Sequence, residues 1–184
     1  GGTFWDRFVV RVAPAENNLP YREASRINIH RDTWGTNLYQ QINWWAPVSN
    51  VEKKNTMIFY PDYFDVPVKN TTSTWDLNIY LANRKKGDFS YPSAPQLKED
   101  LPSNIKKIPV TIKPGEILCF SGAHLHSSSK EKSENTRISF EIRTICENDL
   151  NSSAQAPNVD CDLQWKFPKI FKKINDNSPL KITS

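Results

Sequence analysis

Histidine and aspartate are the residues of this 184-residue chain whose spacing could build a metal site. His30 and Asp32 are separated by one residue at the end of a strand-like run, Arg26-Ile27-Asn28-Ile29. In a strand, residues i and i+2 point to the same face, so these two side chains could aim at one point. The only other histidines, His124 and His126, follow a second strand-like run much later in the chain. A histidine arriving from that strand would complete a set of two imidazoles and one carboxylate.

Two imidazoles and a carboxylate on one side of a metal leave the remaining positions open, which suits non-haem Fe(II) that must also hold oxygen and a cosubstrate. A His-x-Asp tripeptide alone is weak evidence, and any single histidine is more often a surface or core residue than a ligand. Here, however, all three histidines of the chain fall inside the two candidate segments. The sequence therefore predicts a metal site that joins these segments.

The stretch 115–137 contains further ordered features. Gly115-Glu116 precedes the apolar run Ile117-Leu118-Cys119-Phe120, His126-Ser127-Ser128 follows, and Arg137 stands eleven residues after His126 and thirteen after His124. Together with His30-x-Asp32, these features resemble the phytanoyl-CoA dioxygenase-like branch of the Fe(II)/2-oxoglutarate-dependent oxygenases. The resemblance covers about 26–145, and its spacing favours His126 over His124 as the distal ligand. Pro61-Asp62-Tyr63-Phe64 departs from the Pro-Gly-Ser-His that the family often has there, which leaves the substrate class open.

This resemblance implies a dioxygenase that hydroxylates a small molecule with molecular oxygen and releases succinate and CO2 from 2-oxoglutarate. Fe(II) would be held by His30, Asp32 and His126. The far carboxylate of 2-oxoglutarate would need a fixed cation, and Arg137 offers a planar, bidentate one, with Ser128 adding a hydroxyl group. Arg143 is a rival for that carboxylate, because it lies on the same face of the same predicted strand.

Two other functions stay open at this point. A cupin-type metal enzyme that oxidises its substrate without a cosubstrate would not need Arg137 at its spacing. A non-catalytic jelly-roll module that binds a ligand would tolerate loss of the metal without loss of the ligand.

Several short strands with turn signals between them favour a mostly β sandwich or barrel, and with the resemblance this becomes a double-stranded β-helix, the jelly-roll barrel of the cupins, with a few flanking helices. Strands are expected at 3–12, 25–30, 38–48, 56–60, 108–112, 116–120 and 137–145. The polar face of 38–48 makes Gln41 and Asn43 candidates for contact with the cosubstrate. Trp34, Tyr39, Trp45 and Tyr60 are candidates for the substrate wall.

Outside the strands, the pattern predicts a helix over 74–85 with Trp75, Ile79 and Ala82 on one face, ended by Gly87. The polar, proline-containing segment 87–106 is either a lid or recognition insert or a plain surface excursion. Residues 147–162 read as linker. We expect one domain over 1–162 and a basic tail over 163–184, whose short helix at 165–174 would dock on the domain.

Composition limits the partners and the location. The net charge of +4 arises in the tail, and the rest of the chain lacks the basic stripe interleaved with aromatics that nucleic-acid binding needs. No apolar run is long enough for a membrane helix, and no signal peptide is visible. Three cysteines without a C-x-x-C pair indicate a reducing compartment, so we expect a cytoplasmic protein, with Cys119 in the core. Substrate identity and oligomeric state are not encoded in any of these patterns.

Overall fold

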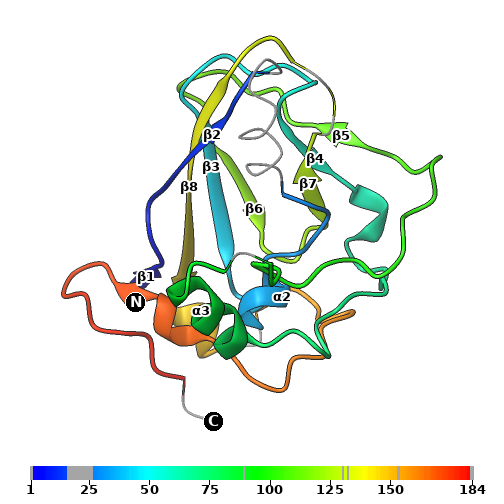
Figure 1. The fold of residues 1–184 in the computed structure, drawn as a ribbon. Coiled ribbons are helices and arrows are strands. Elements are labelled where there is room, and N and C mark those ends of the chain that lie inside the picture. Colours follow the sequence, from blue (N-terminus) through cyan, green and yellow to red (C-terminus); the bar gives the residue numbers. More distant parts are fainter. Residues whose placement is uncertain are drawn as a thin grey trace.

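The computed structural model describes residues 2–15, 27–88, 90–129, 131, 133–152 and 154–182. These residues form a mostly β fold with two antiparallel sheets and a few short helices (Figure 1). The strands are β1 (Thr3–Trp5), β2 (Val9–Ala13), β3 (Ile42–Pro47), β4 (Met57–Phe59), β5 (Ile108–Pro109), β6 (Leu118–Ser121), β7 (His126–Ser128), β8 (Arg137–Cys146) and β9 (Lys172–Lys173). The helices are α2 (Thr33–Thr36), α3 (Leu77–Lys85), α4 (Glu147–Leu150) and the 3₁₀ turns Pro61–Tyr63 and Pro168–Ile170.

The larger sheet is organised around β8, its longest strand. Its order is β6-β3-β8-β1-β9, and β2 also pairs with β8. Asn43 of β3 lies opposite Arg143 of β8, and Trp45 lies opposite Glu141. Directly opposed residues of antiparallel strands point to the same face. Alternate residues of β3 and β8 therefore face one interior together.

The smaller sheet has the order β5-β4-β7 and faces the larger sheet across the interior, as Figure 1 shows. An isolated antiparallel bridge between His30 and His126 places the segment before α2 beside β7. The backbones of these two residues exchange both hydrogen bonds, each 3.0 Å long. Two segments that are far apart in the sequence are thereby held in one register.

The strand predictions hold best where the apolar alternation is long. The strand at 137–145 is confirmed as β8, 38–48 and 56–60 contain β3 and β4, and 116–120 overlaps β6. The strand predicted at 108–112 is shorter, because β5 covers only Ile108–Pro109. Residues 3–12 form two strands instead of one, with Asp6 in the break between them. Residues 25 and 26 of the predicted first core strand lie outside the described residues, and residues 27–30 do not form a strand, since only His30 pairs, in an isolated bridge. The expectation of a mostly β fold is confirmed.

Two helical predictions need correction. The helix predicted at 74–85 begins later, at Leu77, because the Asp76 side chain accepts hydrogen bonds from the backbone nitrogens of residues 78 and 79 and caps it. Trp75 is buried before the helix, whereas Ile79 is 48% exposed, so they do not form the predicted common face. The tail forms the 3₁₀ turn and β9 instead of a helix over 165–174.

The last twenty or so described residues pack onto the sheets instead of leaving them. β9 pairs with β1, and Phe171 and Leu180 join a buried cluster with Phe4, Leu38 and Ile145. The segment 147–162, predicted as linker, ends in buried positions: Cys161 is 8% exposed and packs with Trp34 and Leu163. Burial is the physical reason that this part of the chain is ordered despite its polar composition.

All three cysteines are free thiols, but their places differ from the expectation. Cys119, predicted in the core, is exposed because it lies on the outer face of β6, and Cys161 is the buried one. Among the described residues, no helix has the length and apolar character needed to cross a membrane.

Candidate metal centre

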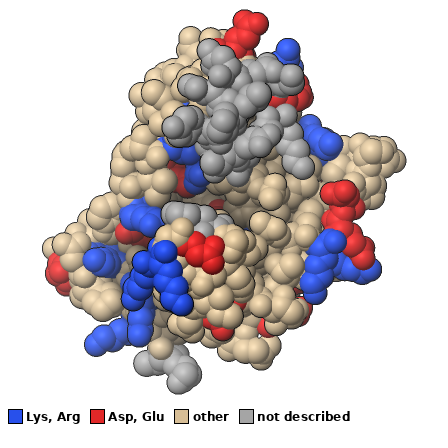
Figure 2. All heavy atoms as spheres, viewed as in Figure 1, with Lys and Arg blue, Asp and Glu red and all other residues tan. Residues whose placement is uncertain are grey.

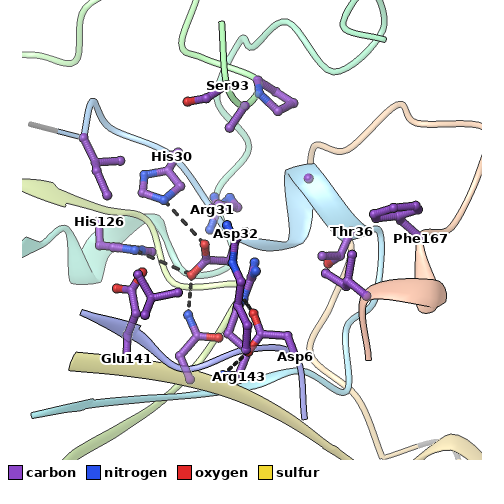
Figure 3. A pocket seen from close by; sticks show the side chains of 18 of the residues that line it. Asp6, His30, Arg31, Asp32, Thr36, Ser93, His126, Glu141, Arg143 and Phe167 are labelled. Carbon is purple, nitrogen blue, oxygen red and sulfur yellow. Dashed lines mark hydrogen bonds and ion pairs between the residues drawn. The ribbon is translucent and has the colours of Figure 1, made fainter. Parts of the chain in front are cut away.

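Three side chains from the two segments converge on one point in the interior. Ligand atoms of His30, Asp32 and His126 all lie within 4.8 Å of one another. The Nε2 atom of His30 is 3.6 Å from Oδ1 of Asp32, and Nε2 of His126 is 3.7 Å from Oδ2 (Figure 3). Ligands at about 2.1 Å from one ion lie about 3 Å apart, so small side-chain shifts would bring the three groups around a single metal. The donor set therefore fits a transition-metal ion.

Backbone hydrogen bonds fix the orientation of both imidazoles. Nδ1 of His30 lies 2.8 Å from the carbonyl oxygen of Asn28, and Nδ1 of His126 lies 2.9 Å from that of His124. A carbonyl oxygen can only accept, so each Nδ1 carries the proton and donates it. In the neutral ring, the lone pair then sits on Nε2 and points toward Asp32, which is the arrangement that a metal-ligating histidine needs.

The route by which Asp32 reaches the site differs from the prediction. The backbone leaves the extended conformation after His30, and Asp32 has φ −65° and ψ −29° at the start of α2. The two side chains still converge, because the turn brings the carboxylate back toward the imidazole. The same turn sends Trp34 into the core, where it is fully buried and donates a hydrogen bond of 2.7 Å to Asp160. Trp34 therefore does not form part of the cavity wall, contrary to the expectation from an extended chain.

Burial and mutual charges shape the acid–base state of the site. Burial lowers the pKa of His126 to about 4, with the neighbouring His30 acting in the same direction. Burial also opposes the charge on His30, but hydrogen bonding and attraction to Asp32 outweigh it, and the pKa of His30 is raised. Burial would raise the pKa of Asp32, yet His30 and His126 hold it well below its usual range. A carboxylate that stays ionised beside a neutral imidazole is suited to bind a cation.

A chain of buried amides supports Asp32 from behind. Asn43 donates through Nδ2 to Oδ2 of Asp32, Gln41 donates to Oδ1 of Asn43 at 2.9 Å, and Thr36 donates to Oε1 of Gln41 at 3.1 Å. Gly122 makes room for this chain, because a Cβ there would come within 2.7 Å of the Gln41 side chain. Asn43 lines the cavity, as its predicted face requires, whereas Gln41 is fully buried behind it. Their contacts are those of residues that orient Asp32.

Arg31 anchors the loop between the two ligands. Its side chain is 2% exposed and forms an ion pair of 3.1 Å with Asp160. It also donates to the backbone carbonyls of Ala123 at 2.5 Å, Tyr63 at 2.7 Å and Val66 at 3.0 Å. Every arm of the guanidinium is therefore used. The sequence analysis missed this residue, because a charge between two metal ligands carries no periodic signal and its partner Asp160 lies in the segment predicted as linker.

The triad opens into a cavity of about 910 Å³. One side is formed by β3 and β8, and another by Trp75 with the first turns of α3. Residues 93–96 of the long polar segment also line it, as does Phe167, and Figure 3 shows Ser93 and Phe167 on different sides of the triad. Part of the segment 87–106 therefore forms cavity wall.

The two arginines predicted as rivals have different surroundings. Arg137 is 3% exposed, and none of its guanidinium nitrogens has a hydrogen-bond partner among the described residues. Its guanidinium lies 5.5 Å from the ring centroid of Trp45, which lines the cavity. Burial, reinforced by the charge of Arg11, lowers the pKa of Arg137 to about 10. Two residues along the same face, the hydroxyl of Ser139 is also buried without a partner in the described chain. Sequence reasoning named Ser128 instead of Ser139.

Arg143 lines the cavity directly and is held by Asp6. Oδ2 of Asp6 accepts from Nε of Arg143 at 2.6 Å, and Oδ1 accepts from the backbone nitrogen of Arg143 at 2.9 Å (Figure 3). Burial opposes the charge on Arg143, but attraction to Asp32 and Asp6 raises its pKa overall. Asp6 was not singled out from the sequence, although its position in the break between β1 and β2 gave a signal: a lone acid interrupting an apolar run.

The remaining predicted residues lie away from the cavity. Ser128 accepts a hydrogen bond from the backbone nitrogen of Ile27 at 3.1 Å and so joins two segments. Tyr39 and Tyr60 pack around the cluster that contains Trp34, and the Tyr60 hydroxyl lies 3.0 Å from that of Ser127. Of the four aromatic residues predicted for the substrate wall, only Trp45 lines the cavity.

Comparison with known proteins gives a likeness of fold. The chain is similar to the solved structure of ThoJ, a non-heme monooxygenase, with a TM-score of 0.51 and 14% identity over 78% of this chain and 46% of that one. It is also similar to EvdO2 from Micromonospora carbonacea var. aurantiaca, with a TM-score of 0.53 and 9% identity over 91% of this chain and 56% of that one. A further EvdO2 structure is described as complexed with 2-oxoglutarate. The chain thus spans about half the length of these proteins.

No protein-family model matches the sequence, and no curated protein matches it either. At such low identity, the likeness to solved structures concerns the fold alone.

Proposed function

We propose that this chain carries the metal centre of an Fe(II)- and 2-oxoglutarate-dependent oxygenase that hydroxylates a small molecule. The single observation that carries the proposal is the pairing of a buried His-Asp-His cluster with a buried arginine that has no partner in the described chain. The metal cluster alone would suit several metal enzymes. The unpartnered cation adds the specific requirement of a bound anion.

The order of the strands supports a double-stranded β-helix as the frame of this site. Along the chain, β2 lies in the larger sheet, His30 bridges to the smaller one, and β3 returns to the larger. β4 and β5 then lie in the smaller sheet, β6 in the larger, β7 in the smaller and β8 in the larger. This repeated crossing between two facing sheets is how a jelly-roll barrel is wound. The likeness of fold to a non-heme monooxygenase agrees with it.

His30, Asp32 and His126 would hold the metal on one face, and the amide chain through Asn43 would fix the carboxylate. Fe(II) bound there would supply the redox chemistry that couples conversion of 2-oxoglutarate to succinate and CO2 with hydroxylation of the substrate by molecular oxygen. The remaining residues position these groups and exclude water.

Arg137 would bind the far carboxylate of 2-oxoglutarate. A buried guanidinium presents several donors in a fixed fork, which matches a carboxylate in two parallel hydrogen bonds. The unpartnered hydroxyl of Ser139, on the same face of β8, could donate to the same anion. Trp45 would form the wall beside the aliphatic part of the cosubstrate, because its ring lies against Arg137 and lines the cavity. These contacts favour Ser139 over Ser128 for the hydroxyl group.

The proposal also includes the branch of the oxygenases to which the chain would belong. The resemblance to the phytanoyl-CoA dioxygenase-like branch rests on the spacing of His30, Asp32, His126 and Arg137. We retain that branch as part of the proposal, with a reducing, cytoplasmic setting and a small-molecule substrate.

The experiment that tests the proposal is anaerobic reconstitution with Fe(II), followed by titration with 2-oxoglutarate and recording of the visible spectrum. We expect a weak charge-transfer band that is absent in His126→Ala. His124→Ala is the matched control, because His124 lies two residues away and outside the triad, and it should keep the band. Arg137→Ala should need about 10- to 100-fold more 2-oxoglutarate, since hydrogen bonds to charged groups contribute about 1.5–3 kcal/mol.

Two outcomes would redirect the proposal. If Fe(II) binds and no band forms at any concentration of 2-oxoglutarate, a cosubstrate-free metal enzyme of the cupin type takes its place. If no metal binds, a non-catalytic ligand-binding module does.

A further inference from the structure

The guanidinium of Arg143 lines the cavity in a fixed position, and only part of its hydrogen-bonding capacity is taken up by the described residues. Its side chain is 25% exposed, whereas that of Asp6, which holds it, is 3% exposed. Asp6 occupies Nε and the backbone nitrogen of Arg143, and its own backbone nitrogen donates to the Arg143 carbonyl at 3.1 Å. Among the described residues, the two terminal nitrogens have no hydrogen-bond partner. Asp6 therefore fixes the Nε edge of the guanidinium, and the edge with the two terminal nitrogens is available to a ligand.

The open edge lies close to the metal site. Asn43, which donates to Asp32, is directly opposite Arg143 on the neighbouring strand. Figure 3 shows Arg143 and Asp6 together beside Asp32. Arg137 lies six residues earlier on β8, which corresponds to roughly 20 Å of extended strand. The two arginines therefore serve different ends of the interior, and one small dicarboxylate would not need both.

The charge of the cavity favours an anion at this point. Within the described part of the chain, the lining holds seven basic side chains and three acidic ones. None of the three acids is free: Asp6 is bound to Arg143, Glu141 is bound to Arg11 at 2.5 Å, and Asp32 belongs to the triad. In the space-filling view, blue basic side chains gather beside and below the hollow near the centre (Figure 2). An anion entering the cavity would meet more cations than carboxylates, although Asp6 and Asp32 also attract Arg143.

The other walls suit an apolar body attached to that anion. Trp75 lies just before α3 and Tyr80 lies near its start. Both line the cavity, and their ring centroids are 6.3 Å apart. Phe167 lines the cavity on the side of α2, where its backbone nitrogen donates to the Thr36 carbonyl at 2.9 Å. Aromatic walls with a few placed polar groups are typical of small-molecule sites.

We propose that Arg143, held by Asp6, is the anion-binding subsite for the substrate, so that the substrate is a small molecule carrying a carboxylate or phosphate group on an apolar body. This inference rests on the proposed oxygenase function for its assignment of the ligand as substrate. The binding itself depends only on Arg143, Asp6 and the cavity walls. It can therefore be measured with or without the metal.

The test uses two matched probes, 3-phenylpropionate and its neutral amide, titrated against the anaerobic protein saturated with Fe(II) and 2-oxoglutarate and against the metal-free protein. Binding is followed by tryptophan fluorescence and by calorimetry. We expect the carboxylate to bind at least tenfold more tightly than the amide. Arg143→Gln should remove that preference and leave the 2-oxoglutarate titration within about twofold, since a neutral amide cannot make the charged, bidentate contact.

Two further variants separate the subsite from general charge. Arg7→Gln removes the same charge from an exposed residue that lines the same cavity, and we expect the Kd of the carboxylate to change less than twofold. Arg143→Lys keeps the charge but loses the planar fork, and we expect an intermediate Kd. Circular dichroism of each variant checks that it is folded.

Three results would overturn the inference: equal binding of carboxylate and amide to the wild-type protein, an unchanged preference in Arg143→Gln, or the same loss in Arg7→Gln as in Arg143→Gln. If Arg143→Gln instead abolishes the 2-oxoglutarate titration, Arg143 is the cosubstrate residue and the inference also fails. Failure of the oxygenase function would appear separately, as a missing visible band in a protein that still distinguishes the two probes.

Discussion

Replacing Arg137 by methionine should stabilise the metal-free protein while it weakens binding of 2-oxoglutarate. The residue is 3% exposed and forms no ion pair among the described residues, and the cost of burying its charge outweighs the attraction of the nearby Glu141. Lowering the pKa of this guanidinium to about 10 corresponds to about 3 kcal/mol of free energy lost at neutral pH. Methionine fills similar space without that charge. The variant loses the contact with Trp45, which contributes about 0.5–2 kcal/mol.

The net expectation is a gain of about 1–2 kcal/mol in the free energy of unfolding of the metal-free protein. The pH dependence of this stability difference follows from the same pKa shift. The folded-state pKa of this base is lowered to about 10, so the penalty is fully present below pH 10. It is lost progressively as the pH rises from there to the ordinary pKa of the unfolded guanidinium, because the unfolded chain binds more protons in that interval. The advantage of the variant should therefore be constant around neutral pH. Urea denaturation at pH 7 and 8 measures it.

Arg31→Met is the matched control, because Arg31 is buried to the same degree but fully paired. Its removal leaves Asp160 as an uncompensated buried charge, and such losses cost about 3–5 kcal/mol. The two substitutions are chemically identical and should shift the urea midpoint in opposite directions. The reasoning is refuted if Arg137→Met destabilises the metal-free protein as Arg31→Met does. It is also refuted if Arg137→Met leaves the affinity for 2-oxoglutarate unchanged.

Two further predictions concern residues behind the triad. Asn43→Ala should lower the affinity for Fe(II) by about 10- to 100-fold with little change in the circular dichroism spectrum, because it removes the donor that orients Asp32; an unchanged Kd in a competition titration with a chelator would count against that role. Trp34→Phe should destabilise the protein by about 1–3 kcal/mol, since it leaves a buried oxygen of Asp160 without its donor, whereas Trp44→Phe at a 38%-exposed position should cost less in the same urea titration.

The strands and the candidate ligand positions were predicted from the sequence on different grounds. At the start of β8 and in the first half of β3 alternate residues are buried, such as Arg137 with Ser139 and Asn43 with Trp45, and a one-residue shift in register would turn them outward. The three ligands were identified by residue type and spacing and by the scarcity of histidine. The spacing argument assumed an extended backbone, which the chain leaves after His30. The convergence with Asp32 was still anticipated correctly, because the turn into α2 brings the carboxylate back toward the imidazole.

What could not be predicted depends on partners that are remote in the sequence. Asp160 lies in a polar, proline-containing segment, and its burial is explained by its ion pair with Arg31, 129 residues away, and by the hydrogen bond from Trp34. The hydrogen bonds between Asp6 and Arg143 span 137 residues and likewise have no local signature. Trp34 was assigned to the cavity from periodicity alone, and a four-residue helix was enough to turn it into the core.

The three interior arginines differ in how many of their hydrogen-bond donors are paired within the protein, and this difference suits each to a different role. Arg31 is saturated by Asp160 and backbone carbonyls, so it has no capacity for a ligand and can only hold loops together. Arg143 is saturated on one edge by Asp6 and open on the other, which suits a ligand that enters and leaves. Arg137 forms no hydrogen bond or ion pair among the described residues, and the charges near it oppose each other, with Arg11 lowering its pKa and Glu141 raising it. An unpaired buried charge costs several kcal/mol, and an anion bound beside Arg137 would offset that cost. On this argument we propose that Arg137, the least satisfied arginine, binds the cosubstrate, and that Arg143, the half-satisfied one, binds the exchangeable substrate.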